Sequence, residues 1–162
     1  MVTNMVLRMV GAMLLLGLAV SGQAQTPAND TKITLERWGC FGTCPAYKLS
    51  ISGDGSVVYQ GKAYVSSRGV HKGRVSQSDV QMLVQKFLNA KFFDMSDGGI
   101  VVDLPVRVLS FSVNGRQKQL REGCMCPPEL VALEDDVDKT AQSEKWVRGR
   151  VKMFFHWPWR HS

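Results

Sequence analysis

Apolar and polar side chains alternate along the chain soon after residue 31. Ile33 and Leu35 alternate with polar residues, and the same period of two recurs at Leu49 and Ile51. Alternation of this kind is typical of strands that bury one face. We therefore expect one strand at 32–37 and a second near 47–51.

Two turn signals divide these and later segments into hairpins. A Gly-Asp-Gly sequence at 53–55 separates the second strand from an apolar run at 57–59, which predicts a β-hairpin. An Asn-Gly pair at 114–115 is the strongest short hairpin signal in the chain. It predicts that strands at 106–113 and 116–121 are paired, with the polar second strand at a sheet edge. A further strand is expected between residues 63 and 75.

The first helix is predicted by apolar residues spaced three and four apart. This spacing gives a single stripe on one helix face, and the residues that form it are Val80, Leu83, Val84, Phe87 and Leu88. Either Ser76 or Ser78 is suited to cap the start of this helix. Two phenylalanines at 92–93 are expected to continue the core.

A second helix is predicted to begin at Pro127 or Pro128, since proline is favoured in a first helical turn. Its buried stripe is expected to comprise Leu130, Leu133 and Val137. The acidic residues between them are expected to form its solvated face; these are Glu134, Asp135, Asp136 and Asp138. Trp146 and Val147 are expected to close the core.

The order of strands, helix, hairpin and helix predicts the fold class. It indicates an α+β domain in which a mainly antiparallel sheet of about five or six strands carries two helices packed on one face. At 162 residues the chain is long enough for one such domain.

The N-terminal residues have the pattern of a secretory signal peptide. Arg8 precedes an apolar run at 9–20, and small residues at Gly22 and Ala24 fit cleavage after Ala24. An uncleaved membrane anchor is the alternative, but the run is shorter than the roughly 20 residues that span a bilayer. We therefore predict a signal peptide at 1–24 and a periplasmic or secreted location.

The remaining chain divides into a linker at 25–31, a single domain at 32–147 and a basic aromatic tail at 148–162. The whole chain has a net charge of +6. This balance favours acidic surfaces or simply solubility, and a nucleic-acid partner is not expected because the protein is exported and carries no recognition motif. The tail suggests peripheral contact with a membrane or partner, or a loosely packed terminus; its residues of interest are Phe154, Phe155, Trp157, Trp159 and Arg160.

Four cysteines occur as two close pairs, Cys40 with Cys44 and Cys124 with Cys126. Export makes disulfides their expected chemistry. A local bridge between Cys40 and Cys44 is plausible because glycines in the intervening turn give the backbone the freedom it needs. Bridges that cross between the pairs are the rival arrangement and would close a loop of about 80 residues.

Two functional alternatives use the same cysteines. Two thiolate pairs from distant parts of a chain suit a zinc site, with His71 as a substitute ligand. A thiol-redox protein is the other alternative, although the spacing is not the Cys-x-x-Cys of thioredoxin-like motifs. No other cofactor is predicted. No serine-hydrolase elbow, phosphate-binding glycine loop or nucleophile–base set is present, so no catalytic residue is assigned.

The sequence resembles the DUF6438 family, a bacterial family of uncharacterised domains. The resemblance extends over about residues 32–147 and is most specific in the cysteine turn. The matching segments are Gly39-Cys40-Phe41-Gly42-Thr43-Cys44-Pro45, Gly53-Asp54-Gly55, Tyr59-Gln60-Gly61, His71-Lys72-Gly73, Phe92-Phe93, Asp103-Leu104-Pro105 and Lys145-Trp146-Val147. It implies a small, often exported α+β domain with no established activity. It also implies that Cys40 and Cys44 are a self-sufficient pair, since Cys124, Cys126 and the tail are additions in this chain.

These observations lead to two functional hypotheses. The first is a non-enzymatic binding module of the cell envelope, stabilised by disulfides, whose partner is an envelope protein, a polymer or a small ligand. The second is a zinc-binding or thiol-redox protein built on the four cysteines.

Overall fold

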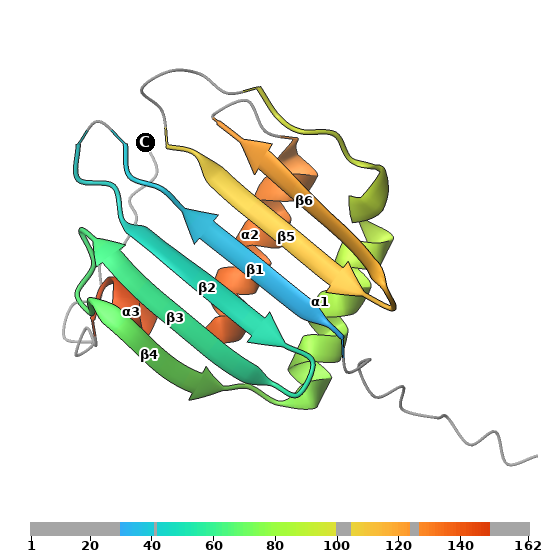
Figure 1. The fold of residues 1–162 in the computed structure, drawn as a ribbon, viewed down its shortest axis with the longest axis horizontal. Helices are drawn as coiled ribbons and strands as arrows, with labels where there is room; N and C mark the ends of the chain where they lie inside the picture. The colour runs from blue at the N-terminus through green and yellow to red at the C-terminus, as the bar shows by residue number, and fades with distance from the viewer. Residues whose placement is uncertain (1–29, 41, 100–104, 124–126, 150–162) are drawn as a thin grey trace, which may run out of the picture.

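A six-stranded antiparallel sheet forms one layer of the molecule (Figure 1). The computed structural model describes residues 30–40, 42–99, 105–123 and 127–149. The strand order is β4-β3-β2-β1-β5-β6. The strands are β1 (Lys32–Arg37), β2 (Ala46–Ser52), β3 (Ser56–Ala63), β4 (Gly69–Arg74), β5 (Arg107–Val113) and β6 (Arg116–Glu122).

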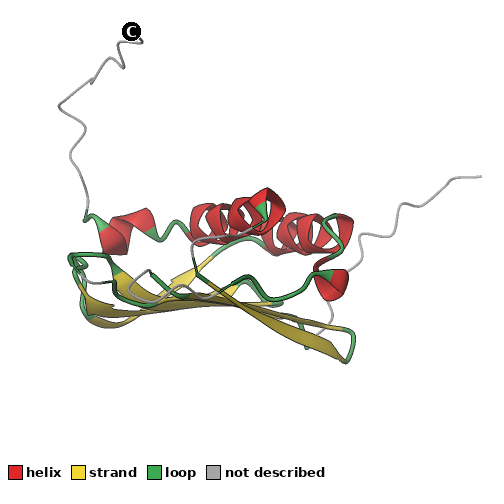
Figure 2. Cartoon of the chain, turned by 90° about the horizontal axis from the view of Figure 1, so that it is seen from above, coloured by secondary structure: helices red, strands yellow, loops and turns green. Residues whose placement is uncertain are grey.

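Helices form the second layer, and Figure 2 shows them on the same side of the sheet. They are α1 (Gln77–Asn89), the 3-10 turn η1 (Phe92–Asp94), α2 (Pro128–Ala141) and the short α3 (Glu144–Val147). The predicted α+β class, with two main helices on one face of an antiparallel sheet, is confirmed. In the part of the chain that the structure describes, no element packs against the other face of the sheet.

The hairpin turns form where the local sequence predicts them. Asn114 and Gly115 both have positive φ, at 51° and 73°, as a two-residue type I′ turn between β5 and β6 requires. Gly55, in the β2–β3 turn, has φ +84°, and a Cβ there would lie 2.3 Å from the Val75 carbonyl oxygen. Only glycine combines this backbone conformation with the absence of a Cβ atom. Gly55 therefore lets the β4–α1 connection lie close against the β2–β3 turn.

Helix α1 begins with the predicted serine cap. The Ser76 hydroxyl accepts a hydrogen bond from the Asp79 backbone N–H at 3.1 Å, which satisfies one of the free amide groups of the first turn. The predicted stripe is buried at Val80, Leu83, Val84 and Phe87, but Leu88 is 40% exposed, so the prediction was wrong for Leu88. At 100° per residue, Leu88 lies about 80° around the helix from Val80, at the margin of the buried stripe.

The core lies between the sheet and the helices. It is built from alternate strand residues that face the helices and from the helical stripes; the largest fully buried side chains are Tyr59, Phe87, Phe92, Phe111, Ile33, Leu35, Leu49, Ile51, Leu83, Leu109, Leu120 and Leu130. Trp146 of α3 closes one end, as predicted, by stacking on Tyr59 with ring centroids 5.0 Å apart. Gly73 admits this ring, since a Cβ there would lie 3.1 Å from it.

The acidic residues of α2 were predicted to form a solvated face, and this was wrong for Glu134, which is fully buried. The side chains of Asp136 and Asp138 are half-buried, at 23% and 20% exposed. The helical phase explains the error, because Glu134 lies four residues after Leu130 and three before Val137, on the same side of the helix. The arginines that compensate these charges come from the sheet.

Candidate functional site

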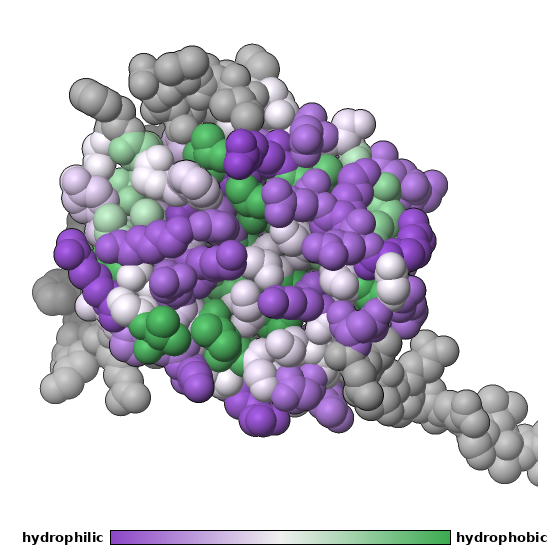
Figure 3. Space-filling view, in the orientation of Figure 1, coloured by the Kyte–Doolittle hydropathy of each residue, from purple (hydrophilic) through white to green (hydrophobic). Residues whose placement is uncertain are grey.

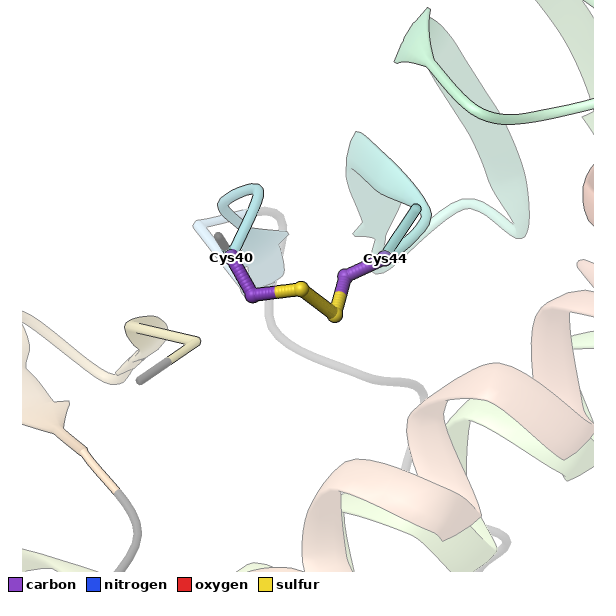
Figure 4. The surroundings of a disulfide bond; sticks show 2 residues. All are labelled: Cys40 and Cys44. Carbon is purple, nitrogen blue, oxygen red and sulfur yellow. A yellow bond between two sulfur atoms is a disulfide. The ribbon is translucent and has the colours of Figure 1, made fainter. Parts of the chain in front are cut away.

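The cysteine turn connects β1 to β2 at one end of the sheet. Cys40 and Cys44 are joined by a disulfide, with their Cα atoms 5.5 Å apart (Figure 4). This is the local pairing that the sequence suggested. The bond closes the turn and leaves neither sulfur as a free thiol.

The other predicted cysteine and tail residues lie outside the described residues. They are Cys124, Cys126, Phe154, Phe155, Trp157, Trp159 and Arg160. His71, the substitute zinc ligand, lies on β4, where its Nε2 is 2.9 Å from the Arg68 carbonyl oxygen and its ring stacks on Trp146. Within the described ranges, no group of three or more His, Cys, Asp or Glu residues is arranged to hold a metal ion. The zinc site therefore stays a prediction.

The feature that the sequence did not predict is a buried ionic cluster between α2 and the sheet. Arg37, at the end of β1, is its centre. The Arg37 guanidinium contacts Asp138 Oδ2 at 2.9 Å through Nη2 and Glu134 Oε2 at 3.3 Å through Nη1. Its Nε donates to the Tyr47 hydroxyl oxygen at 2.9 Å. The cluster therefore links β1 and β2 to the helix layer.

Asp138 is held by several donors. The Tyr47 hydroxyl donates to it at 2.9 Å, and the Ser143 hydroxyl donates to its Oδ1 at 2.5 Å. Burial and then the negative charge of Asp138 raise the pKa of Tyr47, and they raise the pKa of Tyr59 to about 12. Both phenols are therefore neutral at physiological pH, and the hydroxyl groups of Tyr47 and Ser143 donate to Asp138.

A second arginine holds a pair of buried glutamates. Arg107 Nε, on β5, lies 3.0 Å from Glu122 Oε1 and 3.0 Å from Glu134 Oε2. Burial, and then a hydrogen bond with Glu122, raise the pKa of Glu134 well above its usual value of 4.5, although Arg37 and Arg107 oppose the change. Two carboxyl groups in one buried site share a proton rather than both ionise.

Arg37 itself stays charged throughout this network. Burial alone lowers the pKa of Arg37, but Tyr47, Asp138 and Glu134 raise it on balance. The ionic cluster (Arg37, Tyr47, Arg107, Glu122, Glu134 and Asp138) therefore fastens α2 to the end of the sheet through ion pairs and hydrogen bonds.

The opposite side of the sheet is its open face. Alternation places the other half of the strand side chains there, and small hydroxyl and amide groups dominate its centre. The polar residues of the open face are Lys32, Thr34, Glu36, Lys48, Ser50, Ser52, Ser56, Gln60, Lys62, Lys72, Arg74, Ser110, Ser112, Gln117, Gln119 and Arg121. Figure 3 shows the resulting surface, on which hydrophilic residues cover most of the area.

Strand register orders these side chains into rows across the sheet. One row runs from Lys72 through Val58, Ser50, Thr34 and Ser110 to Gln119. The Thr34 and Ser50 hydroxyl groups lie 3.3 Å apart within it. Hydroxyl groups on short side chains leave the middle of the face flat and rich in hydrogen-bonding groups, which suits contact with an extended polar partner.

Comparison with known proteins identifies a family for this chain. The family model for the domain of unknown function DUF6438 matches residues 31–141, from the start of β1 to the end of α2. No curated protein matches the chain. No helix among the described residues is long and apolar enough to cross a membrane. The matched segment includes the disulfide, the ionic cluster and the open face, and it covers more than half of the sequence, so the chain belongs to the DUF6438 family.

Proposed function

We propose that the protein is an exported, non-enzymatic binding module of the cell envelope, and that the open face of its sheet is the binding surface. The observation that carries this proposal is the one-sided architecture. Six paired strands present a continuous polar face on which no described element packs. An antiparallel sheet commonly packs one face against the core and leaves the other in solvent, where partners can reach it.

The internal construction supports a binding role. The ionic cluster and the core hold the helix layer against one face of the sheet. Strand pairing holds the other face in a fixed shape without any element packed on it among the described residues. A preorganised surface loses little conformational entropy when a partner binds. The disulfide between Cys40 and Cys44 suits an oxidising compartment.

Export is tested by the intact mass of the protein from its producing cells. Cleavage after Ala24 predicts a mature chain that starts at Gln25 in the periplasm or medium. A mass that includes Met1, from protein in the cytoplasm, would contradict export.

Binding through the open face is tested by co-sedimentation of the mature protein with an envelope fraction of the producing cells. Ser50→Tyr combined with Ser110→Tyr places two rings at the flat centre of the open face without changing the charge. We expect this variant to lose about tenfold in affinity, because the rings hold a partner away from the surrounding groups.

The matched control is Met82→Tyr, which adds a ring at a 59% exposed position on α1, in the other layer. It should bind like the unmodified protein. Equal binding by the double variant and the control would show that the open face is not the binding surface.

A further inference from the structure

The charges of the protein are divided between its two layers. The strand positions of the open face carry six cations and one carboxylate, which leaves five positive charges; the cations are Lys32, Lys48, Lys62, Lys72, Arg74 and Arg121, and the carboxylate is Glu36. Helices α2 and α3 carry six acidic residues and two lysines, so the helix layer has the opposite balance. The open face is therefore complementary in charge to an anionic partner.

The spacing of the cations indicates the size of that partner. Lys72 and Arg74 lie on β4, at one edge of the sheet, and Arg121 lies on β6, at the other. Five interstrand steps of about 4.8 Å separate these edges, or about 24 Å in all. A ligand that reaches both groups is longer than a simple small molecule, so a polymer fits the face better.

The groups between the cations indicate the chemistry of the polymer. Hydroxyl and amide side chains fill the centre of the face and match a chain of hydroxyl groups. Trp38, which follows β1, is 50% exposed, with Lys62 Nζ 5.5 Å from the centre of its ring. The exposed indole provides an apolar plane for a sugar ring. Lys62 is itself paired with Glu36, so the positive charge for an acidic substituent comes from the other cations of the face.

A lipid surface is less well matched by the same face. The exposed apolar side chains of its strands are two short valines, Val58 and Val70, which do not reach into the acyl region as the long apolar side chains of interfacial helices do. We propose, building on the proposed function, that the open face binds an anionic polysaccharide, with the lysines and Arg121 on its acidic groups and Trp38 on a sugar ring.

The experiment measures binding of the mature protein to polygalacturonate, with neutral dextran, inorganic polyphosphate and phosphatidylglycerol vesicles as comparison probes. We expect polygalacturonate binding that weakens with added salt, and no binding to dextran. Lys48→Gln combined with Lys72→Gln should lower this affinity about fivefold, since two surface charge contacts are lost. Lys139→Gln combined with Arg148→Gln removes two exposed cations from the helix layer and should leave it unchanged.

Trp38→Ala separates sugar recognition from charge attraction. It should weaken polygalacturonate binding about threefold and leave polyphosphate binding unchanged, with an unaltered melting temperature. Three outcomes would overturn the inference. The first is an equal loss of affinity in the open-face and helix-layer charge variants, and the second is an equal effect of Trp38→Ala on polygalacturonate and polyphosphate binding. The third is binding to vesicles in preference to polygalacturonate. If polygalacturonate fails while envelope binding through the open face persists, this inference falls and the proposed function stands; if both fail, both fall.

Discussion

Replacing Arg37 by Met is expected to lower the free energy of unfolding by about 3 kcal/mol. The change leaves the Asp138 carboxyl group without the guanidinium that contacts it at 2.9 Å, and it removes a hydrogen-bond donor from the buried Glu134. Removing one partner of a buried ion pair costs about 3–5 kcal/mol, because the remaining charge keeps its desolvation penalty. The Arg37 side chain is 21% exposed, which places the expected loss at the lower end. Urea unfolding at neutral pH measures it.

The control for this prediction is Lys86→Met, which breaks an exposed ion pair with Asp136 in the helix layer. Exposed pairs contribute about 0–1 kcal/mol, so this variant should stay close to the unmodified protein. A similar small loss for both variants would mean that the ionic cluster is not what fastens α2 to the sheet.

Replacing Glu134 by Gln is expected to flatten the pH dependence of stability. Because the pKa of Glu134 is raised in the folded state, folded and unfolded chains both hold this proton below about pH 4.5. Above that pH the unfolded chain releases it while the folded chain keeps it, so stability falls as pH rises. One retained proton corresponds to about 1.4 kcal/mol per pH unit.

We therefore expect Glu134→Gln to remove about 2.5 kcal/mol of the decline between pH 5 and pH 7, measured by unfolding at each pH. Glutamine keeps the shape and hydrogen-bond donor of a protonated glutamate. Glu129→Gln removes an exposed carboxyl from the same helix and controls for a change in the charge of α2. If Glu134→Gln shows the same decline as the unmodified protein, Glu134 does not carry the proton in the fold.

Local signals in the sequence were sufficient for most of the fold. The Asn-Gly turn at 114–115, the Ser76 cap and the alternation at Ile33 and Leu35 each depend on neighbouring residues only, and the structure contains all three. The polar strand β6 lies at a sheet edge, as expected. These features follow from backbone geometry, which the immediate sequence determines.

The ionic cluster could not be predicted in the same way. Its arginines lie at 37 and 107, and its acidic residues at 122, 134 and 138, so the cluster exists only once the strands are paired. The helical phase of Glu134, in line with Leu130 and Val137, was the one local signal of its burial. The open face is also a tertiary property, because alternation shows which residues share a face but not whether another element covers them.

The most direct test of the binding surface is lysine labelling of the envelope-bound protein, with an amine-reactive reagent and mass spectrometry. Lys32, Lys48 and Lys72 report on the open face, and Lys139 and Lys145 report on the helix layer. We expect bound protein to be protected at the first three lysines and labelled as in free solution at the other two. Protection of the helix-layer lysines, with the open-face lysines labelled as in the free protein, would contradict this expectation.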